Sequence, residues 1–288
     1  MKNIAAVIIL YHPKILEVEK NISLLASQVS HCFIVDNSVP KTEQLMLPDN
    51  ATLISLGENV GIAKAQNIGL KKAQEQNADF TVLFDQDSQV TKSIVIDLHK
   101  SYYLEAAKTH KVIAVGPRPF DIFTQKIMIP SVQKEHASLS ELTICSQIIA
   151  SGKMIKMEYL DEVGLFLEEL FIDGVDHEWC WRAKVKGFSV AINESVIMNH
   201  QLGDARGRFL GITYKIGSPI RLFYQFRNIL ILSRRDYVPT YWKLRNLISI
   251  PVRFVIFSIR GPNRSKRIRF MLRGIFKGIL YNSKTINN

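Results

Sequence analysis

The chain of 288 residues has few cysteines and no long apolar run. Its three cysteines, Cys32, Cys145 and Cys180, form no Cys-x-x-Cys pair, which argues against a disulfide framework and a structural zinc site. The longest apolar stretch, Leu247–Ile259, is interrupted by a proline and an arginine and is too short and too charged to span a bilayer. The composition predicts a globular protein of a reducing compartment.

Acidic residues are nearly absent from the last third of the chain. From Gln201 to Asn288, eighteen Lys and Arg accompany only Asp204 and Asp236, a net charge of +16, whereas residues 1–200 carry a net charge of −5. An acidic body with a basic tail indicates an anionic partner for the tail. No nucleic-acid motif accompanies the charge, so we predict an anionic membrane surface as the partner and no nucleic acid. A helical cap with a merely solvated basic face is the alternative.

Within this tail, one segment has the pattern of an amphipathic helix. Basic, aromatic and small residues recur at helical spacing there, at Arg267, Phe270, Met271, Gly274, Ile275 and Gly278. Such a helix with a cationic face is typical of segments that lie in a membrane interface. We therefore predict two parts, a catalytic domain over 1–215 and a basic, membrane-associating helical extension over 216–288.

The first part alternates predicted strands and helices. We expect strands over Ile4–Leu10 (in preference to a signal peptide), His31–Val35, Ala51–Leu56, Phe80–Phe84 and Val112–Val115. The helices expected between them cover about Lys14–Gln28, Asn59–Gln76 and Ser93–His110. This order predicts an α/β fold with a doubly wound, mostly parallel sheet flanked by helices. Further along, we expect strand character over Thr143–Met157, short strands over Ser189–Ile192 and Ser195–Met198, and loop or outer strands over Phe120–Leu142.

Two carboxylates follow the predicted strand that begins at Phe80. Asp85 and Asp87 stand two residues apart in FTVLFDQDS and can reach one point in space. Hard cations such as Mg²⁺ and Mn²⁺ take oxygen ligands and keep phosphate oxygens in their remaining positions. The pattern indicates a metal bridge to a phosphate-bearing substrate, and solvated loop residues are the alternative. His200, after a later apolar strand, is a candidate third ligand or a structural histidine.

The segment ENVGIAKAQNIG places Asn59 and Gly61 at the start of a predicted helix and Asn67 within it. A helix N-terminus offers free N–H groups to a phosphate or a polar base edge. The segment matches neither the dinucleotide fingerprint nor a P-loop, so a capped helix with an internal glycine is the competing interpretation.

The segment FIDGVDHEWCWR concentrates acids at the start of another predicted helix. Asp173, Asp176 and Glu178 are either ordinary partners of the helix dipole or members of a site. Trp179 and Trp181 flank them and could stack on a sugar. A carboxylate in a partly apolar cleft can act as a general base. Since Asp176 and Glu178 are two residues apart, they point about 200° from each other, so we expect only one of them to face the site.

Taken together, the motifs resemble those of glycosyltransferase family 2, and within it the bacterial rhamnosyltransferases of O-antigen and related polysaccharide assembly. The matching pieces span residues 9 to about 228 in the family's order: ILYHP, VDNS, ENVGIAKAQNIG, LFDQDS, SGKMI, LFIDGVDHEWCWRAKVKGF and YQFRN. The resemblance implies the GT-A fold, a nucleotide-diphosphate-sugar donor, and Mg²⁺ or Mn²⁺.

The resemblance also implies roles for individual residues. Asp176 falls at the position of the catalytic base, although Val175 replaces the acid that usually precedes it, so Asp173 stays an alternative. Asp87 would hold the metal, with His200 near the diphosphate as a second ligand. The nucleotide-sugar-binding positions are Tyr11, Asp36, Asn59, Gly61, Asn67, Asp85, Trp179 and Arg182.

The leading hypothesis from the resemblance is an inverting rhamnosyltransferase. It would use dTDP-L-rhamnose as donor and a lipid-linked oligosaccharide as acceptor, peripherally at the cytoplasmic face of the bacterial inner membrane. The alternatives are the same fold with a UDP-hexose or UDP-galactofuranose donor, and a non-catalytic protein that binds membranes or nucleic acid.

Overall fold

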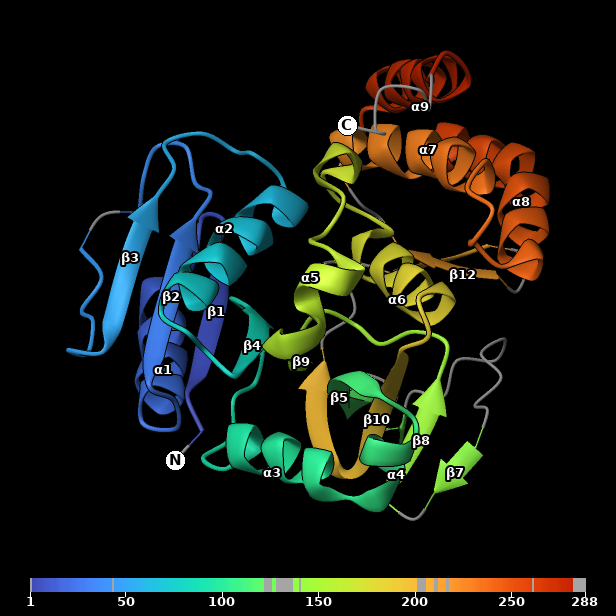
Figure 1. Ribbon diagram of the computed structural model, residues 1–288. Coiled ribbons are helices and arrows are strands. Elements are labelled where there is room, and N and C mark those ends of the chain that lie inside the picture. The colour runs from blue at the N-terminus through green and yellow to red at the C-terminus, as the bar shows by residue number, and fades with distance from the viewer. Residues whose placement is uncertain are drawn as a thin grey trace. The chain divides into compact units, whose positions relative to one another are not determined.

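A computed structural model of the chain describes residues 2–42, 44–121, 126–127, 137–139, 141–200, 206–209, 212–215, 218–260 and 262–281. The chain divides into two compact units (Figure 1). The first unit comprises Met1–Phe171 and Trp179–Gln201, and the second comprises Ile172–Glu178 and Leu202–Asn288.

The first unit is built on a mixed sheet with the order β3-β2-β1-β4-β9-β5-β10-β8-β7, to which β6 adds beside β5. The strand bounds are β1 Ile4–Leu10, β2 His31–Asp36, β3 Ala51–Ser55, β4 Phe80–Asp85, β5 Val112–Asp121, β6 Lys126–Ile127, β7 Ala137–Leu139, β8 Leu142–Cys145, β9 Lys153–Lys156 and β10 Ser189–His200. All of β1 is buried, as its unbroken run of apolar residues requires.

The direction of the strands decides which ends share an edge of the sheet. β1 pairs in parallel with β2 and β4, and β2 pairs in parallel with β3, which confirms the predicted doubly wound start. β9 runs antiparallel to both β4 and β5, and β10 is parallel to β5. The carboxyl ends of β1, β2, β4, β5 and β10 therefore lie along one edge.

The helices of this unit are α1 Ile15–Ala26, α2 Ile62–Glu75, α3 Ile94–Lys100, η1 Ser101–Tyr103, α4 Glu105–Thr109, η2 Met157–Tyr159, α5 Leu160–Val163, η3 Glu168–Leu170 and α6 Val175–Val185, whose first turn belongs to the second unit. The helix predicted over Ser93–His110 is broken, because Leu104 is extended and separates η1 from α4. Gly69 lets α2 approach β1, since a Cβ there would collide with Val7. Figure 1 shows α2 beside β1 and β2.

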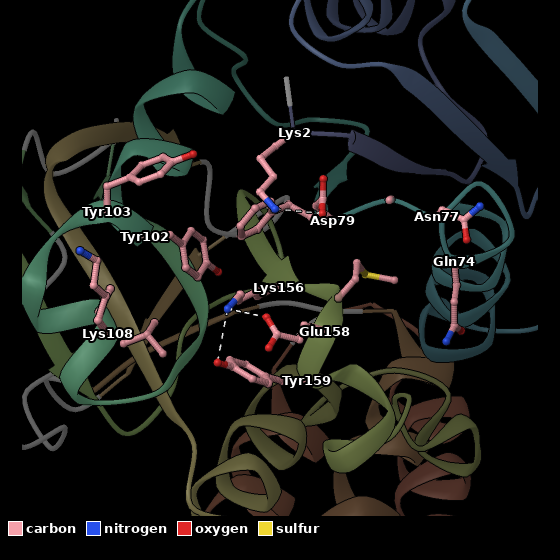
Figure 2. Close-up of a pocket in the computed structure, with 15 residues that line it drawn as sticks. Lys2, Gln74, Asn77, Asp79, Tyr102, Tyr103, Lys108, Lys156, Glu158 and Tyr159 are labelled. Carbon is pink, nitrogen blue, oxygen red and sulfur yellow. Dashed lines mark hydrogen bonds and ion pairs between the residues drawn. The ribbon is translucent and has the colours of Figure 1, made fainter.

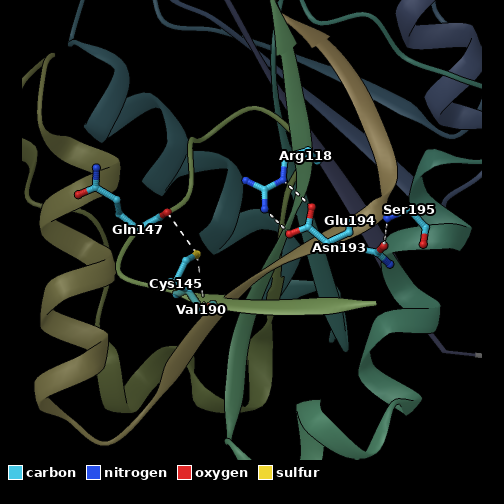
Figure 3. Close-up of polar contacts among 7 residues, drawn as sticks. All are labelled: Arg118, Cys145, Gln147, Val190, Asn193, Glu194 and Ser195. Carbon is cyan, nitrogen blue, oxygen red and sulfur yellow. Dashed lines mark hydrogen bonds and ion pairs between the residues drawn. The ribbon is translucent and has the colours of Figure 1, made fainter. Parts of the chain in front are cut away.

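The two strands predicted over 189–198 are one strand, β10. Its register with β5 shifts between Asn193 and Ile197, so a bulge replaces the predicted break. Arg118 of β5, which is buried, holds the bulge through an ion pair with Glu194 (Figure 3). The side-chain oxygen of Asn193 accepts a hydrogen bond of 2.8 Å from the Ser195 amide.

The strand predicted over Thr143–Met157 is two strands, β8 and β9, of different pairing. β8 lies beside β10, whereas β9 lies between β4 and β5. The chain turns between them at Gly152, which has φ of 77°, and a Cβ there would collide with the ring of Pro117.

The second unit contains a two-stranded sheet and three long helices. Its elements are β11 Arg206–Phe209, β12 Ile212–Lys215, α7 Pro219–Ser233, α8 Thr240–Ile259 and α9 Arg264–Ile279. Leu222, Phe226, Ile256, Phe257 and Met271 from α7, α8 and α9 form its apolar core. Gly274 and Gly278 let α9 approach α7 closely, because a Cβ at either would collide with the α7 backbone or with Leu230.

The segment that the sequence predicts as an interfacial helix forms α9, but much of the pattern faces inward. Arg267, Met271, Gly274 and Gly278 are buried. The guanidinium of Arg234 caps the end of α9 by donating to the carbonyls of Gly278 and Ile279 at 2.7 and 3.0 Å. Among the described residues, none of the helices combines the length and the apolar character that crossing a bilayer requires.

Candidate active site

The loop after β2 is organised by Asp36, which is fully buried. Its carboxylate accepts hydrogen bonds from the Ser38 amide at 3.0 Å and the Thr42 amide at 2.7 Å. Burial acts to raise the pKa of Asp36, but the hydrogen bonds from Ser38 and Thr42 outweigh it, so the pKa lies below its ordinary value. Asp36 is therefore ionised and shapes the loop around it.

Two asparagines join the loops that follow β2 and β3. Asn37, which is buried, donates to the side-chain oxygen of Asn59 at 3.0 Å and accepts from the Val60 amide at 2.8 Å. The same oxygen of Asn59 accepts from the Gly61 amide at 3.0 Å. The predicted residues Asn59 and Gly61 thus lie beside the carboxyl end of β2, where the hydrogen bonds of Asn37 fix their loop.

The start of α2 differs from the prediction of a free helix N-terminus. The helix begins at Ile62 rather than Asn59, and the Ile62 amide donates to the carbonyl of Phe171 at 2.8 Å. Gly61 has φ of 83°, and a Cβ there would stand 2.5 Å from the Phe171 ring. Gly61 is thus required for the approach of Phe171, and the first amide of α2 is already bonded.

Asn67, predicted to shape a nucleotide pocket, is a buried brace between α2 and the segment after α5. Its amide donates to the Phe166 carbonyl at 2.9 Å and to Glu168 at 3.0 Å. Its side-chain oxygen accepts from the Phe166 amide at 2.9 Å. All polar atoms of the side chain are thus used within the fold.

The turn after β4 is fixed from several sides. Gln86 accepts from the Tyr11 amide at 2.7 Å and donates to the Tyr11 carbonyl at 3.1 Å, so it ties the end of β1 to the turn. The hydroxyl of Ser88 bonds the Asp85 amide at 3.0 Å and also contacts the hydroxyl of Ser151. Tyr11 itself is exposed. These bonds tie the turn that carries Asp85 and Asp87 to β1 and to Ser151.

Asp87 is exposed, and its carboxylate makes no hydrogen bond or ion pair with another described residue. His200 ends β10 at the same edge of the sheet, although its side chain lies outside the described part of the structure. The neighbouring Asn199 donates to Gln89 at 2.8 Å, which joins the end of β10 to the segment after Asp87. The free carboxylate suits a hard cation. The described side chains alone bring together no group of three His, Cys, Asp or Glu ligands.

In the second unit, Asp173 is committed to an ion pair. The Nε of Arg221 lies 3.1 Å from both carboxylate oxygens, and an Nη atom lies 2.8 Å from one of them. Asn228 donates to the carbonyls of Ile172 and Asp173 at 2.8 and 2.9 Å. The loop before α6 is thus fastened to α7.

The two other acids of the segment differ, as their two-residue spacing predicts. Glu178 is fully buried and accepts a hydrogen bond of 2.7 Å from the Tyr237 hydroxyl. Asp176 is half-buried, and it has no hydrogen bond or ion pair within the described part of the chain. Of these carboxylates, Asp176 has oxygens available to accept a proton.

The tryptophans, which the sequence suggested could stack on a sugar, pack inside the fold. Trp179 and Trp181 are both buried, and Trp179 donates to the Gly164 carbonyl at 2.8 Å. Arg182 donates to the carbonyls of Val163 and Leu165 at 2.5 and 2.8 Å. These side chains join α6 to the α5 segment. The buried indole rings fill the interior, and the guanidinium of Arg182 bonds the carbonyl groups at the end of α5.

Several residues of these networks were not predicted as site residues, among them Asn37, Gln86 and Arg221. Asn37 and Gln86 lie inside the quoted motifs VDNS and FDQDS, next to the chosen aspartates, so the motifs themselves carried the signal. Arg221 lies outside every acidic motif, and its pairing with Asp173 depends on tertiary structure.

The opposite edge of the sheet carries a cavity of about 680 Å³ that includes none of the predicted site residues (Figure 2). Lys156 lies 2.6 Å from Glu158 there, and Lys2 lies 3.3 Å from Asp79, so its charges are largely paired. The cavity lies where β4 and β5 begin, away from the carboxyl ends at which ligands of such sheets bind.

Comparison with known proteins decides the family. The chain is 32% identical to the dTDP-rhamnosyl transferase RfbF of Shigella flexneri over 96% of this chain and 95% of the relative. The chain belongs to the rhamnosyltransferase family of glycosyltransferases. The resemblance inferred from the motifs is confirmed, and the protein is an enzyme that transfers a sugar. No family model matches the sequence.

Solved structures of glycosyltransferases share the fold. TarS residues 1–349 from S. aureus match with a TM-score of 0.55 and 14% identity over 97% of this chain and 81% of that chain. GalNAc-T7, solved with UDP, GalNAc and Mn²⁺, matches with a TM-score of 0.58 and 12% identity over 99% of this chain and 57% of that chain. The GT-A fold that the sequence predicts for this chain is thereby confirmed.

Proposed function

We propose that this glycosyltransferase moves L-rhamnose from dTDP-L-rhamnose to a hydroxyl of a lipid-linked glycan in the synthesis of a cell-surface polysaccharide. The observation that carries the proposal is the relationship over nearly the whole length of both chains to an enzyme named dTDP-rhamnosyl transferase. The motif-bearing loops at one edge of the sheet support a donor site there, since ligands of doubly wound sheets bind at the carboxyl ends of the strands.

Asp176 acts as the general base in this proposal. Its carboxylate is free to take the proton of the acceptor hydroxyl, whereas Arg221 holds Asp173 and Tyr237 bonds Glu178. As the proton moves to Asp176, the acceptor oxygen bonds the anomeric carbon and the bond from that carbon to the diphosphate breaks. The leaving nucleotide takes the electron pair, and this single displacement inverts the anomeric centre.

Asp87 would hold a divalent cation, with His200 as the candidate second ligand. The open carboxylate of Asp87 at the carboxyl edge fits this role. A bound Mg²⁺ or Mn²⁺ would stabilise the negative charge that develops on the diphosphate. Asp85 would contact ribose or sugar, Tyr11 lies exposed beside it, and the loops shaped by Asp36, Asn59 and Gly61 would hold the nucleoside.

The enzyme would work peripherally at the cytoplasmic face of the bacterial inner membrane. The net charge of +16 over 201–288 supports attraction of this part to anionic lipids. A lipid-linked acceptor would then be within reach of an enzyme bound at that surface.

The donor is tested by incubating the purified chain with dTDP-L-rhamnose, UDP-hexoses and UDP-galactofuranose in the presence of Mg²⁺ or Mn²⁺. With water as the acceptor, we expect hydrolysis of dTDP-L-rhamnose to dTDP and free rhamnose, and the largest thermal stabilisation from dTDP. If the enzyme preferred a UDP-sugar, that sugar nucleotide would take the place of dTDP-L-rhamnose as the proposed donor. The solved TarS complex with UDP-GlcNAc makes a UDP-sugar the second candidate.

The metal role is tested by a matched pair of variants, Asp87→Asn and Asp49→Asn. The pair separates loss of a metal ligand from a general loss of charge, because Asp49 precedes β3 at the opposite edge of the sheet.

A further inference from the structure

The helix α8 exposes a continuous apolar ridge. Leu244, Ile248 and Val255 are 56%, 72% and 53% exposed. With Tyr241, Val252 and Ile259 they recur at helical spacing, and the ridge from 241 to 259 is about 27 Å long at 1.5 Å per residue. The periodicity places all six residues on one side of the helix.

The opposite side of α8 is apolar as well and is already used. Ile250, Phe254 and Phe257 pack with α7 and α9 in the core of the second unit. A globular helix normally keeps one apolar face and one polar face, and a helix that is apolar all round is buried or contacts lipid. Helix α8 therefore has a second apolar face, and exposure of this face to water is unfavourable.

The charges around the ridge favour an anionic surface as its partner. Residues 218–281 contain fourteen Lys and Arg against Asp236 as the single acid. Arg245 borders the ridge by helical spacing, and Arg260 follows its end. On α9, a hollow of about 480 Å³ is lined by Lys266, Arg269 and Arg273, with Ser265 and Phe270. Phosphate headgroups supply the complementary charge.

A second copy of the chain fits the ridge poorly. Pairing two ridges would bring together two units that each carry a large positive charge, and such charge opposes self-association. Lys243, Arg245 and Arg253 within α8 oppose crossing of the bilayer core, and no helix among the described residues is long and apolar enough to cross it. A helix that lies along the surface satisfies both constraints.

We propose that α8 lies in the plane of an anionic membrane and inserts Leu244, Ile248, Val252 and Val255 among the acyl chains. The amphipathic segment singled out in the sequence, α9, instead packs against α7 through its glycines and contributes exposed cations. The inference deepens, and rests on, the proposed location at a membrane surface.

The test uses the full chain with the double substitution Ile248→Ser and Val255→Ser, both at exposed positions outside the core. Partition to vesicles containing phosphatidylglycerol should fall at least about tenfold, because several methylene groups leave the acyl region. The matched control is Leu16→Ser, which changes a residue 82% exposed on α1 of the first unit and should leave partition unchanged.

A second readout separates insertion from charge attraction. Trp242 lies on α8 and is half-buried, whereas Trp179 and Trp181 are fully buried. Vesicles with brominated acyl chains should quench Trp242, and quenching should persist at about 1 M NaCl, where the Debye length is about 3 Å. A Trp242→Phe variant identifies the signal.

Equal partition of the double variant and the unaltered chain would overturn the inference. So would complete loss of binding at high salt, or a lipid-free dimer that the double substitution dissociates. Donor turnover, measured without lipid, reports on the proposed reaction separately. Full turnover with no effect of the ridge substitutions would reject the inserted helix and leave the proposed reaction standing.

Discussion

Arg221 grips both carboxylate oxygens of Asp173, while Asp176, three residues further on, has no partner within the described part of the chain. The bidentate guanidinium occupies both carboxylate oxygens of Asp173 and holds the side chain in one place. The sequence left both aspartates open as the base. The ion pair supports Asp176, and it gives Asp173 the task of fixing the loop in front of α6.

Replacing Asp176 by asparagine should lower kcat for transfer about 10²- to 10⁴-fold, because the amide cannot take the acceptor proton. Binding of dTDP should stay within about twofold, since the donor does not need the base. Steady-state kinetics and calorimetry measure the two effects.

The control is Asp173→Asn, which should lower the thermal midpoint while retaining a larger share of kcat than Asp176→Asn. If Asp173→Asn were the more damaging to kcat at equal folded fraction, Asp173 would take over as the proposed base.

Asn37→Ala should weaken both the fold and nucleotide binding. The substitution removes the hydrogen bonds to the side-chain oxygen of Asn59 and to the Val60 amide. Leaving these two polar groups without their partner in a buried place costs about 1–3 kcal/mol. Asn50→Ala is the matched control, because Asn50 bonds the carbonyls of Ala26 and Val29 away from the nucleotide loops. Urea unfolding should show a loss for both variants, and dTDP titration only for Asn37→Ala. Equal dTDP affinities would contradict a role of this bridge in the donor site.

The fold could be predicted furthest where the signal is local. The alternation of apolar strands and helices predicts the order β1 to β4 and their parallel pairing, because buried parallel strands are continuously apolar. The bulge at Asn193 and the insertion of β9 between β4 and β5 depend on partners far apart in the chain, which periodicity does not encode.

The candidate site shows the same division. Motifs locate Asp36, Asp87 and Asp176 without reporting how their carboxylates are bonded. The sequence alone suggests that Trp179 could stack on a sugar. Its burial follows from the packing of α6 against the α5 segment, and no local sequence pattern reveals that packing.

Stability should fall in acid partly through Glu194. Burial acts to raise its pKa, but Arg118 and Thr143 outweigh this, so the pKa in the folded state lies below the ordinary value of 4.5. The contribution is therefore fully present above about pH 4.5 and is lost as the pH falls through the folded-state pKa. Glu194→Gln should lower the free energy of unfolding by about 1–3 kcal/mol at pH 7 and by less at pH 3.5. Urea unfolding at the two pH values measures this, and an equal loss at both would refute the assignment.

Gly274→Ala should destabilise the second unit although alanine favours helices. In a helix open to solvent the change would gain about 1 kcal/mol. At this position the new Cβ would collide with the carbonyl of Phe223 on α7, so α9 would have to move away from α7 and would draw its own core residue Met271 out of the apolar core. Gly116→Ala is the control, because its Cβ would meet Ile148 at an ordinary 3.5 Å. We expect a lower thermal midpoint and earlier proteolysis of α9 for Gly274→Ala, with little change for Gly116→Ala. A raised midpoint for Gly274→Ala would show that α9 does not pack tightly on α7, and the exposed cations of α9 would then need a different explanation.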